Sequence, residues 1–483
     1  MNIPILSKLT GRKKTSLTSI IRSPLVTLLK KYADKNDYPF FENTPLYHRS
    51  DKIDIPLALF LPRAGLVLFE DKEWRYKELC NAKASKASHA QSSQNSLAFE
   101  NIGDFIKEKF VDLSGHDDIV IFNFVIMEQL SEEEFDLLDE SFHHLLPKER
   151  ILFRDSTLEE IEEKFQKLQS KKRPYTVQNT LPFIFSQYTI LDKEKIYFAN
   201  KEQRAFIDKP LKNFETLCGD RQSGKSTSVI QKALLEKLEH PDKKITILTP
   251  TNLHADLLKQ TLLELVEHSS VVLDMNAIVI HTPLELLELY KKRRDYSDVI
   301  FVDDALLMEE EFLSYIKQTQ KERALLFVES QKDRTSLTFS HSYYGKIEFV
   351  KNREFPTLMK KLANLLKNDD KNDILIFASA HDFEDMKEDI ESFTGIELSF
   401  VDTDKPLREQ KLTRIKLCSH DEKNPLHGDY VFLMQSCQSD KNALEHLAKS
   451  SKTKSFILYE DECDTILELK NLLEKSNAKD KKE

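Results

Sequence analysis

The sequence predicts an α/β protein: an amino-terminal α+β domain followed by two units built on parallel sheets. The chain has 483 residues, two to three times the usual size of one domain, so it should form more than one core. From about residue 195 onward, short apolar runs alternate with helical stretches, which is typical of parallel sheets with helices on both faces. A glycine-bearing loop joins the first of these runs to its helix.

Composition excludes several classes of protein. Hydrophobic residues make up 40% and charged residues 31% of the chain, and no apolar run approaches the roughly 20 residues of a membrane helix. The five cysteines include no C-x-x-C pair, which disfavours a disulfide framework or a thiolate zinc site. We therefore expect a cytoplasmic protein without a membrane partner. The net charge of −10 disfavours a general polyanion coat but leaves local basic faces open.

The amino-terminal α+β domain is expected over residues 1–190. Two apolar strands flank the turn at residues 62–65, a further buried run covers residues 119–126, and the charged, proline-bearing segment 171–174 suggests a boundary. We expect the two α/β units at residues 191–368 and 369–475, and a charged tail at 476–483.

A phosphate-binding loop is the most specific motif. The pattern G-x-x-x-x-G-K-[ST] follows a predicted strand and opens a helix, as this motif requires. Such a loop wraps a phosphate with backbone N–H groups, while its lysine reaches the β- and γ-phosphates and its serine ligates Mg²⁺. The sequence therefore predicts ATP and Mg²⁺ as cofactors. The ATP-binding residues are Gly219, Asp220, Arg221, Gln222, Ser223, Gly224, Lys225, Ser226 and Thr227.

Two acids at the end of a later apolar run complete the predicted nucleotide site. Residues 299–302 read as a buried strand, and Asp303 and Asp304 follow it directly. We expect Asp303 to hold Mg²⁺ together with Ser226, and Asp304 to orient or deprotonate the attacking water. Lys225, Asp303 and Asp304 are thus the predicted catalytic residues of ATP hydrolysis.

Further landmarks resemble superfamily 1 DNA helicases of the UvrD/Rep type. Residues 200–207 resemble the Q motif, which implies that Gln203 reads the adenine edge. Residues 249–252 resemble motif Ia and residues 281–283 motif Ib, which implies single-stranded or tailed DNA as a partner, contacted by Thr251, Asn252 and Thr282. The resemblance implies two RecA-like domains, with aspartate at Asp304 in place of the family's catalytic glutamate.

The second RecA-like domain departs from this family. The segment after the strand at residues 324–328 has lost the motif III pattern, residues 415–432 resemble an eroded motif V, and residues 442–455 lack the motif VI arginine. Because such an arginine contributes 10³-fold or more to hydrolysis, slow hydrolysis, or a protein partner that supplies an arginine or regulates turnover, is expected. Lys449, Lys452 or Lys454 could supply charge instead. The segments between motifs are too short for strand-separating insertions.

The amino-terminal domain carries a D…E-x-K pattern, formed by Asp54, Glu70 and Lys72. Two carboxylates could hold a metal ion while the lysine positions the attacking water, so the three are predicted catalytic residues and Asp54 and Glu70 predicted metal ligands. Residues 54–74 resemble the nuclease-related NERD domain, with the chain's single tryptophan just after the lysine. The resemblance implies a PD-(D/E)xK-like fold, but the family's first-helix glutamate is missing.

Two function classes remain open at this point. The first is a helicase-type ATP hydrolase that processes DNA and could also cut it. The second is a nucleotide-gated DNA-binding or scaffold protein with little hydrolysis or unwinding, which the missing motif VI arginine favours. A P-loop kinase is a more distant alternative. The resemblance of residues 249–252 to motif Ia and the order of the domains disfavour it.

Overall fold

The computed structural model describes the greater part of the chain: residues 23–81, 93–115, 119–169, 175–192, 195–269, 271–292, 297–320, 323–329, 337–340, 342–351, 354–368, 372–421, 423–434, 441–460 and 462–479. The predicted boundary at 171–174, the altered motif III at 330–333 and the end of the charged tail lie outside these residues. The chain forms two compact units, residues 1–198 with 266–272, and residues 199–265 with 273–483. No described helix is long and apolar enough to cross a bilayer.

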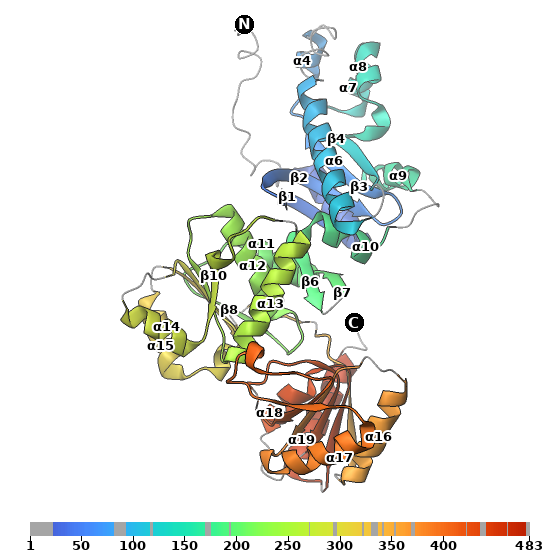
Figure 1. Ribbon diagram of the computed structural model, residues 1–483. Helices are drawn as coiled ribbons and strands as arrows, with labels where there is room; N and C mark the ends of the chain where they lie inside the picture. The colour runs from blue at the N-terminus through green and yellow to red at the C-terminus, as the bar shows by residue number, and fades with distance from the viewer. Residues whose placement is uncertain are drawn as a thin grey trace. The chain divides into compact units, whose positions relative to one another are not determined.

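The first unit is built on a five-stranded mixed sheet of order β1-β2-β3-β4-β5 (Figure 1). Its strands are β1 (Phe40–His48), β2 (Asp51–Leu61), β3 (Gly65–Asp71), β4 (Ile121–Met127) and β5 (Ile151–Phe153). β1, β2 and β3 pair antiparallel, whereas β3, β4 and β5 pair parallel. The predicted hairpin around residues 62–65 is therefore present, and so is the α+β character of this part.

Helices pack on this sheet and close its cores. They are α3 (Pro24–Asn36), α4 (Tyr76–Asn81), α6 (Ser93–Ser114), α7 (Glu132–Asp136), α8 (Glu140–Leu145), α9 (Leu158–Leu168) and α10 (Val177–Ile184), and a β6–β7 hairpin (Thr189–Asp192, Lys195–Phe198) follows. Leu29 of α3 and Phe165 of α9 are fully buried against sheet residues such as Phe124. Leu137 ends α7 as its C-cap, so α7 and α8 are two separate short helices.

Gly65 is required where β3 approaches β4. Its φ of 129° lies in a region that side chains rarely adopt, and a Cβ there would lie 2.2 Å from the carbonyl oxygen of Val120. That carbonyl accepts a hydrogen bond from the backbone N–H of Leu66. A larger residue at position 65 would therefore separate β3, which carries Glu70, from its parallel neighbour.

The second unit contains two six-stranded parallel sheets. The first has the order β10-β9-β11-β12-β8-β13, and all its described pairings are parallel. Its strands are β8 (Glu215–Gly219), β9 (Ile245–Leu248), β10 (Ile278–His281), β11 (Val299–Val302), β12 (Ala324–Glu329) and β13 (Leu337–Phe339). The helices between them are α11 (Lys201–Asp208), α12 (Lys225–Glu239), α13 (Asn252–Ser269), α14 (Pro283–Lys291) and α15 (Glu310–Thr319). The predicted parallel α/β unit is confirmed.

The last sheet has the order β14-β19-β18-β15-β17-β16 and is also parallel. Its strands are β14 (Lys346–Lys351), β15 (Ile374–Ala378), β16 (Leu398–Val401), β17 (Ile415–Ser419), β18 (Gly428–Met434) and β19 (Ser451–Tyr459), and its helices are α16 (Phe355–Asn368), α17 (Phe383–Thr394), α18 (Lys441–Ala448) and α19 (Asp464–Lys479). β14 pairs with β19, and Leu358 of α16 is buried in this sheet's core. The last sheet therefore includes elements that precede the expected boundary at 368/369.

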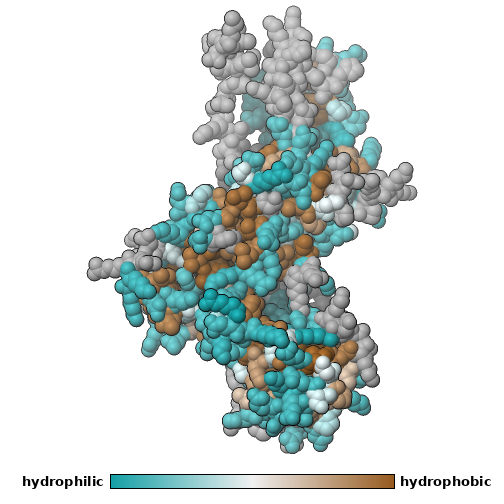
Figure 2. Space-filling model, viewed as in Figure 1, coloured by the Kyte–Doolittle hydropathy of each residue, from teal (hydrophilic) through white to brown (hydrophobic). Residues whose placement is uncertain are grey.

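The exposed surface is mainly hydrophilic on the face shown in Figure 2, with smaller brown areas between the teal ones. Large hydrophobic residues that are strongly exposed come from separate elements, such as Leu137 after α7 and Leu284 on α14. Scattered residues of this kind are normal on a protein surface.

Candidate nucleotide site

The glycine-bearing loop joins β8 to α12 in a compact turn. Gln222 and Gly224 have φ values of 60° and 79°, so the loop passes through left-handed conformations before α12 begins at Lys225. The Lys225 ammonium group donates to the carbonyl oxygens of Gly219 and Asp220 at 2.7 and 2.8 Å. The lysine thus lies across the loop, with its pKa lowered by burial although Asp304 and Asp303 favour its charged form.

Two glycines leave no room for side chains in this loop. A Cβ on Gly219 would lie 2.8 Å from the Ser223 hydroxyl, and one on Gly224 would lie 2.5 Å from the amide nitrogen of Gln203. Gln203 comes from α11, is buried, and donates to the Ser223 carbonyl at 2.9 Å while accepting from the Asn200 N–H. In this structure the Gln203 side chain stabilises the phosphate loop through this hydrogen bond to Ser223.

Asp303 lies at the carboxyl end of β11 and is completely buried. Neither carboxylate oxygen accepts a hydrogen bond of normal geometry from a described residue. The closest cation is the His254 imidazole, whose Nε2 lies 3.4 Å from Asp303 Oδ2. Burial raises the pKa of Asp303, but His254, Ser226 and Lys225 outweigh it, so that the net pKa is lowered.

The donor set at Asp303 fits Mg²⁺. A buried, ionised carboxylate costs free energy unless cations stabilise it; the His254 imidazole lies 3.4 Å from one of its oxygens, and the Ser226 side chain is close enough to influence its pKa. Hydroxyl and carboxylate oxygens are ligands that Mg²⁺ prefers. Ser226 and Asp303, the two predicted ligands, are therefore together in the structure.

Asp304 follows Asp303 in a left-handed conformation with φ of 49°. Burial and the neighbouring Asp303 charge raise its pKa, although His254, Lys225 and Arg221 oppose them. A carboxylate with a raised pKa next to a metal-binding carboxylate is suited to accept a proton from water. The structure places Asp304 near the predicted nucleotide site.

His254 was not predicted from the sequence. It lies in the first turn of α13, and its Nδ1 lies 3.9 Å from Asp304 Oδ2. Burial lowers the pKa of His254, but its close contact with Asp303, then the charge of Asp304, raises the pKa overall. The only sequence signal was its position three residues after Thr251, where a helix start brings it next to the end of β11.

The tip of the phosphate loop contacts the last sheet's connections. The Arg221 guanidinium donates to the carbonyl oxygens of Asn424 and Leu426 at 2.6 and 3.1 Å. The Gln222 amide donates to the carbonyls of Lys449 and Ser451, both at 2.8 Å. These contacts join the loop to the segments before β18 and around the start of β19.

Lys449 approaches the same loop from the last sheet. Its ammonium group lies 3.3 Å from Asp220 and 2.9 Å from Glu445. Burial lowers the pKa of Lys449, but the two carboxylates raise it overall. Of the three lysines considered as substitutes for an arginine, Lys454 instead pairs with Glu348 on β14.

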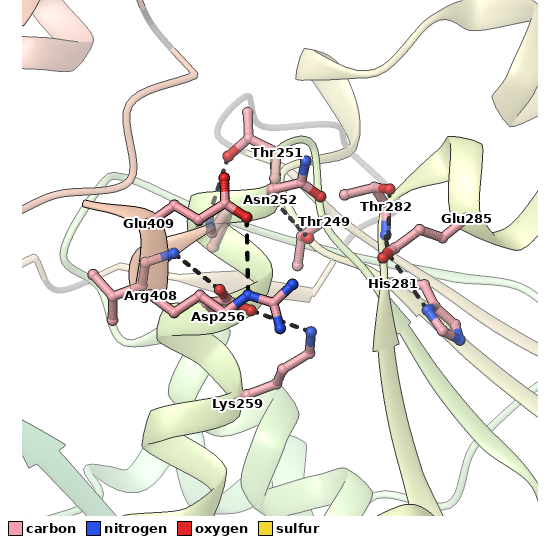
Figure 3. A network of polar contacts seen from close by, with 12 residues as sticks. Thr249, Thr251, Asn252, Asp256, Lys259, His281, Thr282, Glu285, Arg408 and Glu409 are labelled. Carbon is pink, nitrogen blue, oxygen red and sulfur yellow. Dashed lines mark hydrogen bonds and ion pairs between the residues drawn. The ribbon is translucent and has the colours of Figure 1, made fainter. Parts of the chain in front are cut away.

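The residues predicted to contact nucleic acid are largely occupied by local contacts (Figure 3). Thr251 is buried, and its hydroxyl accepts the N–H of His254 at 3.2 Å. The Asn252 amide donates to the Asp404 carbonyl at 2.7 Å. Thr282 caps α14 through Glu285, which accepts the Thr282 N–H at 2.8 Å and lies 3.5 Å from His281. Contact of these residues with DNA stays a prediction.

A cavity of about 280 Å³ lies away from the phosphate loop, between β9, β10 and α14. Thr246, His281 and Leu286 are among its lining residues. None of the residues predicted to hold ATP lines it. This is expected, because a phosphate loop binds its ligand with exposed backbone N–H groups and needs no enclosed apolar cavity.

In the first unit, the D…E-x-K residues divide into two ion pairs. Asp54 lies on β2 with 69% of its side chain exposed, and its carboxylate is 3.5 Å from Lys52. Glu70 and Lys72 form a direct ion pair at the end of β3, and burial lowers the Lys72 pKa although Glu70 favours the charged form. The described β2–β3 pairing extends only to Ala58 and Leu68, so no described pairing joins Asp54 to Lys72.

Two further carboxylates, those of Asp71 and Glu128, interact with each other beside this ion pair. Burial, then the charge of Glu128, raises the pKa of Asp71 to about 6. Glu128 follows β4 and accepts the hydroxyl of Ser23 and, at 3.0 Å, the N–H of Leu25 at the start of α3. The sequence alone did not indicate Glu128, because its proximity to β3 depends on the parallel pairing of β3 with β4.

A second acidic group in the first unit consists of His48, Glu108 and Asp112, whose potential ligand atoms lie within 4.8 Å of one another. Arg49 already pairs with Glu108 at 3.0 Å and also with Asp112 at 2.5 Å. Burial, then the Lys109 and Arg49 charges, lowers the pKa of His48. Arginine therefore already supplies the positive charge that a metal ion would provide here.

No protein-family model matches the chain, and no curated protein matches it. Among solved structures, it is similar to S. cerevisiae Dbp5 bound to RNA and ADP BeF3, with 12% identity, a TM-score of 0.44, and coverage of 57% of this chain and 86% of Dbp5. It is also similar to the DUF1998 helicase MrfA bound to DNA, with 9% identity, a TM-score of 0.44, and coverage of 56% of this chain and 50% of MrfA. The chain thus spans about half the length of the MrfA chain.

Proposed function

We propose that the second unit is an ATP hydrolase whose turnover is coupled to DNA, as in superfamily 1 helicases. ATP binds the loop at residues 219–227, and Ser226 and Asp303 hold Mg²⁺, which screens the phosphate charge. Lys225 binds the β- and γ-phosphates, and Asp304 orients and deprotonates the attacking water. The observation that carries this proposal is the buried Asp303 carboxylate, which has no hydrogen-bonded partner of normal geometry and lies beside Ser226.

The arrangement of strands supports this proposal. β12 lies between β8, which leads into the phosphate loop, and β11, which ends at Asp303. Because the three strands are parallel, their carboxyl ends share one edge of the sheet. Ligands of open α/β sheets bind at that edge.

Steady-state ATP turnover, measured with and without single-stranded DNA, tests the proposal. We expect Mg²⁺-dependent hydrolysis that rises when single-stranded DNA is added and that Lys225→Ala removes. Hydrolysis equal in wild type and Lys225→Ala would contradict the assignment of the site. A rise with RNA but not with DNA would change the proposed partner while keeping the hydrolase.

A nucleotide-gated DNA-binding or scaffold protein is the second candidate. The contacts of Arg221 and Gln222 with four backbone carbonyls favour it, because they tie the phosphate loop to the last sheet and could make nucleotide binding a conformational signal. This candidate predicts ATP-dependent DNA affinity with little turnover. Strand displacement on a tailed duplex separates the two: robust ATP-dependent unwinding would exclude the scaffold alternative.

For the first unit we propose a NERD-like, metal-dependent DNA-cleaving domain that uses Asp54, Glu70 and Lys72. The Glu70–Lys72 pair at the end of β3 supports this proposal, because a lysine next to a metal-binding carboxylate can meet developing phosphate charge. Cleavage of DNA by the full chain in Mg²⁺, compared with EDTA, is the direct test. Equal cleavage in both would exclude a metal-dependent nuclease.

A further inference from the structure

Besides Lys225, the proposed hydrolase lacks an obvious arginine for the γ-phosphate. After Arg353 the sequence contains only Arg408 and Arg414. The Arg408 side chain is 84% exposed beside Glu409, and Arg414 donates to the Asn372 carbonyl before β15. Lys449 reaches the loop, but Asp220 and Glu445 both pair with it. None of these cations is available for a phosphate without giving up an existing contact.

Arg221, within the phosphate loop, differs from these cations because it is buried and has an unused hydrogen-bond donor. It is 7% exposed, and none of the described carboxylates lies within ion-pair distance of it. One terminal nitrogen donates to the carbonyls of Asn424 and Leu426. The other terminal nitrogen, NH1, is buried and has no hydrogen-bond partner among the described residues. The chain therefore holds a buried guanidinium with unused donors.

The charge of Arg221 acts on the same groups that would surround the γ-phosphate. It adds to burial in lowering the pKa of Lys225 and opposes the raised pKa of His254; burial lowers the pKa of Arg221 itself to about 10, although Asp304 favours its charged form. Arg221 thus lies in electrostatic contact with the phosphate-binding lysine and with the carboxylate proposed as the base. A buried cation with unpaired donors is costly unless an anion binds it.

We propose that Arg221 binds the γ-phosphate of ATP through its free guanidinium nitrogen and supplies, from within the phosphate loop, the charge that a motif VI arginine supplies elsewhere. This inference rests on the proposed function. In the step that it assists, the water oxygen bonds to the γ-phosphorus and the water proton passes to Asp304. The bond from that phosphorus to the β,γ-bridging oxygen breaks, and ADP keeps its electron pair. Arg221 neutralises the charge on the transferred oxygens.

The proposed binding of the γ-phosphate by Arg221 also explains why this residue contacts the segments next to the last sheet. The Asn424 and Leu426 carbonyls hold one terminal nitrogen of the guanidinium group and leave the other, NH1, without a hydrogen-bond partner among the described residues, so the side chain is oriented before ATP binds. A planar group fixed in this way loses little conformational entropy when its second edge binds phosphate. The segment before β18 thereby positions a residue of the phosphate loop.

Single-turnover and steady-state hydrolysis with Arg221→Gln test the proposal. Glutamine is uncharged and shorter than arginine, so it removes the charge together with the reach to the Asn424 and Leu426 carbonyls. We expect kcat to fall by about 10³-fold, Mg²⁺–ATP affinity to change by less than about threefold, and the tight complex with ADP and aluminium fluoride, which mimics the transition state, to be lost. Arg221→Lys should recover only part of kcat, because it lacks the planar fork.

Three companion variants make the test decisive. Arg408→Gln, which removes an exposed arginine, should leave kcat unchanged, and melting temperatures should show that each variant is folded. The proposal is overturned if Arg221→Gln keeps wild-type kcat, if its kcat and ATP affinity fall equally, or if Lys449→Gln lowers kcat more. If Lys225→Ala binds ATP as well as wild type does, the proposed nucleotide site itself is contradicted. The proposal for Arg221, which depends on that site, is then contradicted as well.

Discussion

The two predicted metal sites of this chain are placed very differently by the fold. In the second unit, Lys225, Ser226, Asp303 and Asp304 come from two strand ends of one parallel sheet, and pKa values of all three charged groups respond to one another. In the first unit, Asp54 is exposed and pairs with Lys52, whereas Glu70 pairs with Lys72. The difference teaches that the arrangement of a site is easier to predict when its residues belong to one local backbone motif than when they depend on the register between two strands.

The reason lies in how each motif is built. The phosphate loop is continuous in sequence, and its glycines and the following helix determine its shape. The D…E-x-K residues come from β2 and β3, and a one-residue shift of register moves a side chain to the opposite face of the sheet. Asp54 instead lies opposite Pro45 of β1, beyond the described β2–β3 pairing.

The largest expected effect concerns the weaker of the two sites. If Asp54, Glu70 and Lys72 share one metal site, then Asp54→Ala, Glu70→Ala and Lys72→Ala should each abolish metal-dependent DNA cleavage. A plasmid-nicking assay in Mg²⁺ measures this. Loss in Glu70→Ala and Lys72→Ala with full activity in Asp54→Ala would show that the exposed aspartate is not a ligand. Glu128→Gln would then be the next variant to measure, since Glu128 acts on neighbouring Asp71.

The stronger site should respond to removal of its buried carboxylate. Asp303→Ala deletes a proposed Mg²⁺ ligand, and metal stabilisation of a phosphoryl-transfer transition state amounts to several kcal/mol. We therefore expect ATP turnover to fall at least about a hundredfold. Asp242→Ala, which removes an exposed carboxylate of the same unit, is the matched control. Turnover of Asp303→Ala within a few-fold of the control would separate Asp303 from the metal.

A smaller effect distinguishes the two units by pH. Burial lowers the pKa of Lys109 in the first unit to about 7 and that of Lys232 in the second unit to about 8. Between these values and about 10 the unfolded chain binds more protons than the folded one. The free energy of unfolding therefore rises with pH, by up to about 1.4 kcal/mol per pH unit for each lysine.

Replacing these lysines tests that assignment unit by unit. Lys109→Met should flatten the pH dependence of unfolding reported by Trp74, the single tryptophan, which lies in the first unit. Lys232→Met should leave the Trp74 signal unchanged. An unaltered pH slope in Lys109→Met would mean that the buried amino group does not titrate in this range.

Local patterns predicted much of the fold. The short apolar runs expected from about residue 195 onward form the strands of two parallel sheets, and the turn at 62–65 joins β2 to β3 as predicted. β14 was not assigned to the last sheet, because only its pairing with the distant β19 reveals where it belongs. Periodicity describes one segment at a time and carries no information about such partners.

In the candidate site, too, local features could be predicted from the sequence and contacts between remote segments could not. The loop and Asp303 could be predicted, since each follows a buried strand with a recognisable pattern. His254 and the contacts of Arg221 with Asn424 and Leu426 could not, because they join segments that are remote in sequence. Thr251 and Thr282 were predicted to contact DNA, yet their side chains also carry the helix-capping function that Ser and Thr commonly have.

The central claim, that residues 219–227 with Asp303 form a Mg²⁺–ATP site, is tested most directly by titration calorimetry. Wild type and Lys225→Ala are titrated with ATP in Mg²⁺ under identical conditions. The structure predicts measurable binding to wild type and at least tenfold weaker binding to Lys225→Ala, about 1.4 kcal/mol of binding free energy. Equal affinity of the two proteins for ATP, or no binding by wild type, would contradict the nucleotide site.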